Sequence, residues 1–159
     1  MDRDVFRRIL GRFATGVAVV TTAVEGSLHG ITVNSLTSVS LDPLLVLVCI
    51  ERRARAHAEI ERARRFGVNF LRHDQEAISR LFAASSAPEE GRLRGVPFRI
   101  GRHGTPILED RLAHLECDVS ERFSGGDHSI FLGSVLGGDL AASARPLIYF
   151  QGRYRTLAD

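Results

Sequence analysis

The sequence of 159 residues contains no lysine, so all 21 of its basic residues are arginine. Without lysine, the protein cannot form a Schiff base with a carbonyl substrate, and it lacks the phosphate-binding lysine of P-loop nucleotidases. Any anionic group of a ligand must therefore be bound by arginine, by hydroxyl groups or by backbone N–H groups. The net charge is only +2, with both signs interspersed, so no nucleic-acid partner is indicated.

Cysteine is also scarce, since Cys49 and Cys117 are the only two in the chain, and both lie in apolar segments. No pair of cysteines has the spacing that is typical of a metal site, so we expect no metal. Buried free thiols are the expected state, and the spacing gives no support for a disulfide. This use of cysteine fits a reducing, cytoplasmic location.

Long apolar runs and two familiar motifs are absent as well. No run approaches the ~20 residues that a membrane-spanning helix needs, so no membrane partner is expected. Arg7, Arg8 and Arg12 interrupt the N-terminal segment, which therefore lacks the apolar centre of a signal peptide. The glycines never follow the G-x-G-x-x-G spacing of a Rossmann dinucleotide site, so any nicotinamide dinucleotide must bind in another way.

Strand-like segments dominate what is present. Alternating, β-branched or continuous apolar patterns predict strands at 17–24, 28–33, 44–50, 66–71, 113–120, 128–136 and 146–150. Helices are predicted at 6–13, at 55–63 and after Asp74, which we expect to be an N-cap. The stretch 83–105, rich in Gly, Pro, Ser and Arg, is predicted to be irregular. Short connections between many strands predict one domain over 1–159, a largely antiparallel β-barrel with attached helices.

The most informative motif is the polar segment 30–43, which precedes the apolar run 44–50. Small hydroxyl and amide side chains can hydrogen-bond the edge of a flat aromatic ligand and let its ring approach a sheet closely. From the residues alone, an ordinary polar loop between two strands explains the segment equally well.

Two further segments carry charge. Arg52, Arg53 and Arg55 follow the strand that contains Cys49 and come just before or at the start of a predicted helix. An anion at that helix N-terminus would meet unpaired N–H groups and guanidinium charge, although a solvated basic turn is also common. His128 begins a predicted strand directly after a Gly-Asp turn, where a half-exposed structural histidine is the simpler interpretation.

In chain order, the segments 13–22, 30–35, 38–43, 126–133 and 146–155 resemble consecutive signatures of the flavin reductase-like family. The resemblance runs from about Phe6 to Arg155 and is weakest at 84–104. It implies a mainly β fold, the antiparallel Greek-key split β-barrel that binds FMN, with a few flanking α-helices. It also implies an NAD(P)H:flavin oxidoreductase, a homodimer with flavin near the subunit boundary, which supplies reduced flavin to a partner monooxygenase.

The resemblance also implies a set of site residues. Those placed along the flavin ring and its ribityl chain are Thr32, Val33, Asn34, Ser35, Ser38 and Ser40. The segment at the phosphate end contributes Cys49, Arg52, Arg53 and Arg55. The residues placed on the nicotinamide side are Asp127, the catalytic candidate His128, Tyr149, Gly152 and Arg153.

Two departures from the family pattern concern the same site. Ala54 and Ala56 stand where relatives have Ser and Thr that hold the flavin phosphate, so arginine and backbone N–H groups are expected to take that role. Leu44 stands where relatives have a second proline after Asp42-Pro43.

Several alternatives stay open from the sequence. The flavin can be FMN or FAD, and the hydride donor NADH or NADPH. An oxidase of the pyridoxamine-phosphate-oxidase type could use the same barrel, with a cationic pocket for its substrate. A non-catalytic flavin-binding or haem-binding module is a further alternative.

Overall fold

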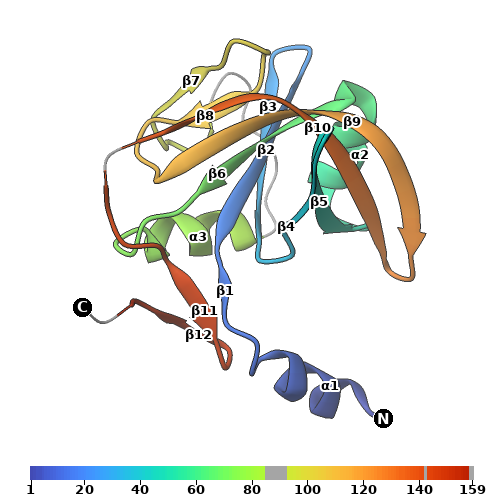
Figure 1. Cartoon of the computed structure of the whole chain (residues 1–159), viewed down its shortest axis with the longest axis vertical. Helices are drawn as coiled ribbons and strands as arrows, with labels where there is room; N and C mark the ends of the chain where they lie inside the picture. The colour runs from blue at the N-terminus through green and yellow to red at the C-terminus, as the bar shows by residue number, and fades with distance from the viewer. Residues whose placement is uncertain (85–92, 142, 158–159) are drawn as a thin grey trace.

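A computed structural model describes residues 1–84, 93–141 and 143–157, and strands dominate it (Figure 1). Seven strands pair in one antiparallel sheet, in the spatial order β3-β2-β6-β9-β10-β5-β4. They are β2 (Ala18–Val24), β3 (Ser27–Val33), β4 (Thr37–Leu41), β5 (Leu44–Glu51), β6 (Arg65–Phe70), β9 (Ala113–Gly125) and β10 (His128–Leu140). The mainly β, antiparallel architecture predicted from the sequence is therefore confirmed.

The sheet curls because its strands twist, and β3 comes close to β5. Ser35, just after β3, connects the two. Its hydroxyl donates to the Cys49 carbonyl at 2.9 Å and accepts from the Cys49 N–H at 3.1 Å. Between β3 and β5, hydrogen bonds of one side chain thus take the place of a backbone ladder. The barrel is therefore split at this point rather than closed by strand pairing.

The inside of the barrel is filled by aliphatic and aromatic side chains. Val48, Phe66, Val68 and Phe131 are fully buried there. Gly133 faces them, and a Cβ at this position would lie 2.5 Å from the Phe66 ring. The core therefore needs glycine at position 133, because a larger side chain would displace the aromatic ring.

Two helices cover the barrel. α2 (Arg55–Ala63) follows β5 and buries Ile60 in the barrel core, and α3 (Glu76–Ala83) packs on β3 through Phe82. A Cβ on Gly30 of β3 would lie 2.7 Å from the Phe82 ring. α3 thus belongs to a second apolar cluster outside the barrel, which includes Leu147 near the C-terminus.

The N- and C-terminal segments form an arm that extends from the barrel (Figure 1). It contains α1 (Arg3–Leu10) and a small antiparallel sheet of β1 (Thr15–Gly16), β11 (Ile148–Phe150) and β12 (Arg153–Arg155). A hairpin of β7 (Phe98–Ile100) and β8 (Pro106–Leu108) completes the fold. None of the three described helices has the length and apolar character needed to cross a membrane.

Four sequence predictions differ from the structure. The helix predicted at 6–13 is α1 (Arg3–Leu10), which ends at its C-cap Gly11, so Phe13 lies outside it. Thr37–Leu41, read as part of a polar loop, is the edge strand β4, because its backbone can pair with β5 whatever its side chains are. β7 lies within the stretch predicted as irregular, of which 85–92 fall outside the described residues. Asp74 does not cap α3; its carboxylate pairs with Arg72 at 2.6 Å instead.

Candidate functional site

The pairing of β5 with β10 brings two predicted site segments together. Cys49 lies opposite Ile130, and Glu51 opposite His128. Because side chains alternate along a strand, residues 48, 50, 129 and 131 point into the core, whereas Cys49 and His128 lie on the outer face. Cys49 is a free thiol and is only partly buried, and burial raises its pKa. The outer face of β5 and β10, from Leu47 to Glu51 and from His128 to Leu132, is called the shelf below.

His128 stands at the rim of the shelf, at the tip of the β9–β10 hairpin. Gly126, with a φ of +71°, makes the turn that places it there. The His128 Nδ1 atom lies 2.7 Å from the Asp127 carboxylate, and 43% of the histidine side chain is exposed. This hydrogen bond lowers the pKa of Asp127. It also fixes the ring, so that Nε2 points away from its own carboxylate partner and is available to a ligand.

The basic turn before α2 adjoins the same hairpin. The Arg52 backbone N–H donates to the Asp127 carbonyl at 3.0 Å, and its guanidinium donates to the Ser124 hydroxyl. Arg53 and Arg55 are exposed and form no hydrogen bond or ion pair within the described ranges. Ala54 occupies the N-cap of α2 and provides no side-chain cap, so the helix starts with open N–H groups. Two cations and an uncapped helix end therefore face solvent together.

The polar side chains from Thr32, near the end of β3, to Ser40 divide into engaged and exposed ones. The Thr32 hydroxyl donates to the Ser79 carbonyl at 2.7 Å, and the Ser35 hydroxyl is used by Cys49. The Ser40 hydroxyl accepts from the Asp42 N–H at 3.2 Å. Asn34 and Ser38 are exposed. The exposed pair is available to a ligand, whereas the engaged hydroxyls hold the chain in place.

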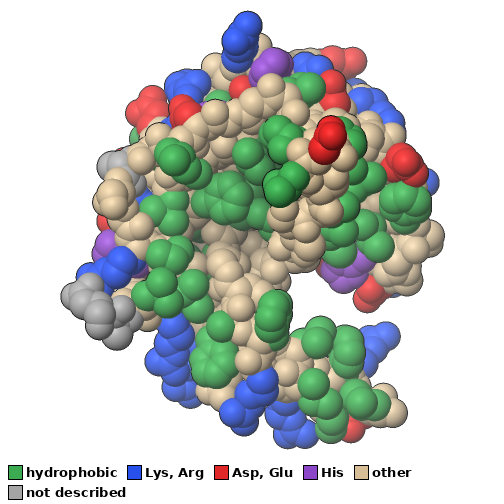
Figure 2. Space-filling model, viewed as in Figure 1, with side chains coloured by type: hydrophobic (Ala, Val, Ile, Leu, Met, Phe, Trp, Pro, Cys, Tyr) green, Lys and Arg blue, Asp and Glu red, His purple; other side chains and the backbone are tan. Residues whose placement is uncertain are grey.

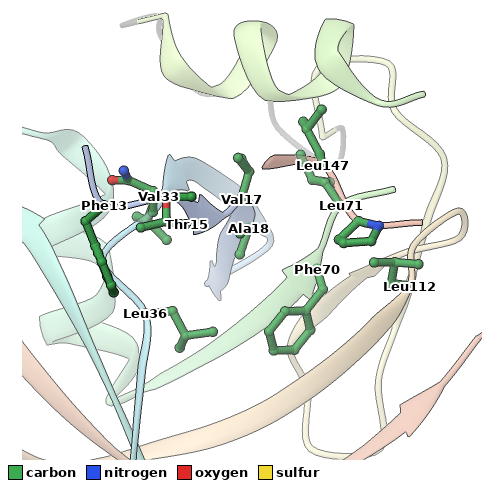
Figure 3. A pocket seen from close by; sticks show the side chains of 14 residues that line it. Phe13, Thr15, Val17, Ala18, Val33, Leu36, Phe70, Leu71, Leu112 and Leu147 are labelled. Atoms are coloured by element: carbon green, nitrogen blue, oxygen red, sulfur yellow. The ribbon is translucent and has the colours of Figure 1, made fainter. Parts of the chain in front are cut away.

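A hollow of about 360 Å³ opens beside this segment (Figure 3). Val33 and Asn34 line it together with mostly apolar side chains, among them Phe13, Leu36 and Phe70. The hydroxyl of Thr15 is buried at its edge without a hydrogen-bond partner among the described residues. The hollow reaches the predicted ring-binding segment but not the basic turn or His128.

The C-terminal residues form a second group on the arm. Tyr149 lies edge-on to Tyr154, with ring centroids 5.4 Å apart, and Gly152 makes the β11–β12 turn at a φ of +72°. The Tyr154 hydroxyl is 2.8 Å from the Ser79 hydroxyl, and the Arg80 guanidinium lies 5.0 Å from the Tyr154 ring centroid. Arg153, next in the chain, is exposed.

Ser79, Arg80 and Tyr154 were not among the predicted site residues. They link the Thr32 strand to the C-terminal hairpin through α3. Tyr154 lies within the C-terminal signature, which was a usable signal. Nothing local marks Ser79, because its partners are 47 and 75 residues away in the sequence.

A notch separates the arm from the β9–β10 hairpin (Figure 2). The shelf and the basic turn lie on the hairpin side, and Tyr149, Gly152 and Arg153 belong to the arm. Among the described residues, no group of three or more His, Cys, Asp or Glu could hold a metal ion.

Comparisons with known proteins bear on this arrangement. Residues 10–158 match the family model described as flavin reductase like domain. The NADH-dependent flavin reductase of Rhodococcus sp is 44% identical over 156 residues, which are 95% of this chain and 84% of the relative. The reductase component of the 4-nitrophenol 4-monooxygenase/4-nitrocatechol 2-monooxygenase of Rhodococcus opacus is 36% identical, over 97% of this chain and 80% of the relative.

A solved structure agrees with these relatives. The Streptomyces globisporus C-1027 NADH:FAD oxidoreductase SgcE6, in complex with NAD and FAD fragments, superposes with a TM-score of 0.92 at 37% identity. The match covers 99% of this chain and 93% of that structure. The protein therefore belongs to the flavin reductase-like family, as the order of its sequence motifs predicts.

Proposed function

We propose that this protein transfers hydride from NADH to FMN or FAD and supplies the reduced flavin to a monooxygenase. One observation carries the proposal: the β5–β10 ladder places His128, the shelf and the basic turn side by side. Two relatives, an NADH-dependent flavin reductase and a monooxygenase reductase component, support both halves of it.

The residues present fit a flavin. Its phosphate or pyrophosphate would bind at the uncapped start of α2, with Arg53 and Arg55 as counter-charges. Its ring would lie on the shelf, where Cys49 and Ile130 offer a partly buried surface without charge. Asn34 and Ser38 are exposed at the edge and can hydrogen-bond the polar rim of the ring or the ribityl chain.

When bound, the flavin supplies the hydride-accepting chemistry, and the protein supplies orientation and electrostatics. His128 Nε2 would hold the nicotinamide carboxamide or donate a proton, while Asp127 keeps the imidazole in place. Asn34 and nearby N–H groups would stabilise the negative charge that hydride arrival adds to the ring. Thr32 and Ser35 act indirectly, since their hydroxyls hold the end of β3.

On the nicotinamide side, we assign Tyr149, Gly152 and Arg153 to the wall of the NADH pocket. The turn at Gly152 keeps Tyr149 and Arg153 on adjacent strands of the arm. A bound dinucleotide would lie in the notch between the arm and the hairpin, where it reaches both the aromatic ring and the exposed guanidinium. The choice between NADH and NADPH depends on this side.

We infer that the active form is a homodimer. The apolar side chains of α1 and of the turn after it are exposed: Phe6, Ile9 and Leu10 of the helix are 53%, 52% and 56% accessible, and Phe13 beyond it is 76% accessible. An arm with this much apolar surface requires a cover, and a second copy of the chain supplies one beside the notch. Sedimentation velocity measures the mass directly, and Phe6→Asp with Ile9→Asp should convert dimer to monomer.

Two free cysteines are compatible with a reducing compartment, so we infer a cytoplasmic location. We also propose that residues 1–159 form one domain.

Steady-state NADH oxidation tests the function. Purified protein is assayed with FMN, FAD and riboflavin, and with NADH or NADPH, against the background rate of the flavins alone. We expect turnover far above that background, preferentially with NADH. Rapid anaerobic bleaching of bound flavin on mixing with NADH separates a reductase from an oxidase of the pyridoxamine-phosphate type. A passive flavin or haem module would give neither signal, and that result would contradict the proposal.

A further inference from the structure

A buried hydrogen bond connects α2, which begins at the basic turn, with β10, which carries part of the shelf. His57, in the first turn of α2, has its Nε2 atom 2.8 Å from the Ser129 hydroxyl of β10. His57 is 6% exposed and Ser129 is 0% exposed. Ser129 directly follows His128, and His57 is two residues beyond Arg55. The bond therefore joins the helix that follows the basic turn to a strand that carries the shelf.

The imidazole of His57 is held on its other sides as well. Its Nδ1 atom lies 3.6 Å from the Glu61 carboxylate, which pairs with Arg122 at 2.7 Å. Its ring meets the Phe131 ring edge-on at 5.2 Å. Burial lowers the pKa of His57 more than Glu61 raises it, so the ring is neutral at pH 7. A neutral imidazole and a hydroxyl satisfy each other, whatever the tautomer.

Besides the bond of His57 to Ser129, the start of α2 is held by Arg52, whose backbone N–H donates to the Asp127 carbonyl at 3.0 Å and whose guanidinium donates to the Ser124 hydroxyl. The N-cap of the helix is Ala54, which offers no side-chain hydrogen bond, and the His57 N–H bonds only to the Ala54 carbonyl within the same turn. Arg53 and Arg55 extend from this turn into solvent. The position of their charges relative to the shelf is consequently set by the packing of the helix, by the contacts of Arg52 with the hairpin and by the bond between His57 and Ser129.

We propose that His57 is a positioning residue which, through Ser129, holds the basic turn at a fixed place relative to the shelf. The inference rests on the proposed function and names what sets the phosphate selectivity of that site. A flavin with a phosphate spans both the shelf and the turn, whereas riboflavin needs only the shelf. Loss of the bond therefore weakens FMN binding and leaves riboflavin binding nearly unchanged.

The test measures dissociation constants of FMN and riboflavin by flavin fluorescence, without NADH. His57→Leu should weaken FMN binding about tenfold, the effect of losing one buried hydrogen bond, and riboflavin binding less than about twofold. Ser129→Ala should do the same without removing the ring. The double variant should be no worse than the stronger single variant, because both changes delete one interaction. His57→Gln, whose amide can reach Ser129, should recover part of the FMN preference.

His29 provides the matched control. It is a buried histidine of β3, 7% exposed, whose Nε2 lies 3.9 Å from Glu59 on the same helix. His29→Leu should destabilise the fold to a similar extent yet keep the wild-type ratio of FMN to riboflavin affinity. Thermal unfolding of each variant shows whether stability losses are comparable.

The outcomes separate this inference from the proposed function. Equal weakening of both flavins, or an unchanged ratio in His57→Leu and Ser129→Ala, would overturn the positioning role. If wild-type protein binds FMN no better than riboflavin, the anion site and the inference both fail. If wild-type protein prefers FMN and the variants lose that preference, but NADH is not oxidised, the inference stands and the proposed function falls.

Discussion

The two sides of the candidate site are held in different ways. On the proposed flavin side, the basic turn and His128 are joined by a backbone ladder and by the buried His57–Ser129 pair. On the proposed nicotinamide side, the C-terminal hairpin meets α3 through side chains, chiefly Tyr154 with Ser79 and Arg80. Contacts between side chains near the surface open at lower cost than a ladder in a packed core. The second arrangement suits a dinucleotide that must enter and leave in every cycle.

His128 lies where the two sides meet, so its loss should have the largest effect. His128→Ala removes the group that orients the nicotinamide or donates a proton, and we expect hydride transfer to slow by about 100-fold. FMN affinity should change by less than about twofold, because the shelf and the basic turn remain. Anaerobic stopped-flow mixing of reductase, flavin and NADH measures the step. An unchanged rate would remove His128 from the mechanism. Asp127→Asn, which leaves the imidazole in place, should slow hydride transfer less than His128→Ala does.

The arginines test whether the flavin side is divided as the structure indicates. Arg53→Ala with Arg55→Ala removes two exposed charges and should weaken FMN binding by about 30-fold, with little change for riboflavin. Arg52→Ala is the matched control, since its guanidinium is bound to Ser124 of the hairpin. Arg52→Ala should lower the affinities for FMN and for riboflavin slightly and to the same extent. Titration calorimetry distinguishes the two patterns, and the reverse result would assign the phosphate to Arg52.

The nicotinamide side should respond more weakly. Tyr154→Phe deletes only the hydroxyl that lies 2.8 Å from the Ser79 hydroxyl. The change loosens the hairpin but keeps the ring contact with Tyr149. We expect the KM for NADH to rise about threefold, with kcat and flavin affinity nearly constant. Ser79→Ala should match it. An effect on FMN affinity instead would show that the link through α3 serves the flavin side.

The sequence predicted the strands of the proposed flavin side, but not the contacts that join the elements of the site, and the reason is physical. Strand periodicity predicted β5 and β10, so Cys49 and His128 could be placed on strands before their register was known. The roles of these residues come from the family motifs and stay predictions. Periodicity cannot show that Ser129 faces His57 or that Ser79 meets Tyr154, because each pair joins residues more than 70 positions apart. β4 was missed because an exposed edge strand need not alternate apolar and polar residues.

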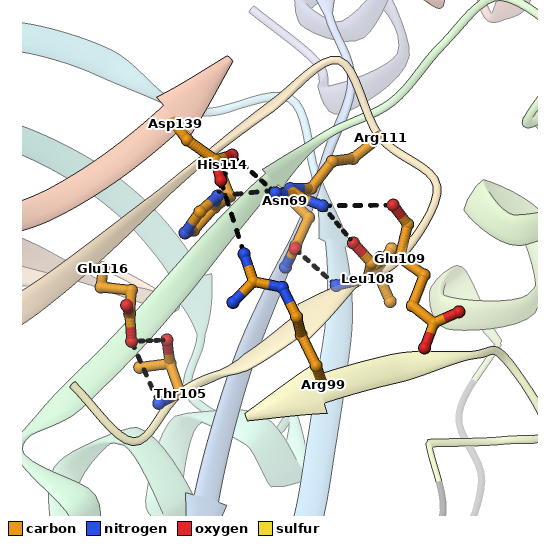
Figure 4. Close-up of polar contacts among 9 residues, drawn as sticks. All are labelled: Asn69, Arg99, Thr105, Leu108, Glu109, Arg111, His114, Glu116 and Asp139. Carbon is orange, nitrogen blue, oxygen red and sulfur yellow. Dashed lines mark hydrogen bonds and ion pairs between the residues drawn. The ribbon is translucent and has the colours of Figure 1, made fainter. Parts of the chain in front are cut away.

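The smallest effect on activity is expected from a region that belongs to neither side. Glu116, 3% exposed, anchors the loop between β7 and β8 by accepting a hydrogen bond from the Thr105 hydroxyl at 2.7 Å (Figure 4). It also accepts one from the His103 N–H at 3.0 Å. Burial alone would raise the pKa of Glu116, but these hydrogen bonds outweigh it and hold the pKa below its usual value. The folded state therefore binds the proton less tightly than the unfolded state does.

A lowered folded pKa means that the carboxylate of Glu116 stabilises the fold above the unfolded value of about 4.3, and that this contribution disappears as the pH falls through the folded value. Glu116→Gln should cost about 1 kcal/mol of unfolding free energy at pH 7, and the difference from wild type should shrink below pH ~4. Urea unfolding across that range measures it. FMN affinity and the KM for NADH should both remain at wild-type values. A change in either constant would show that the β7–β8 loop supports the candidate site. The contrast between the flavin side and the nicotinamide side of that site would then no longer account for activity.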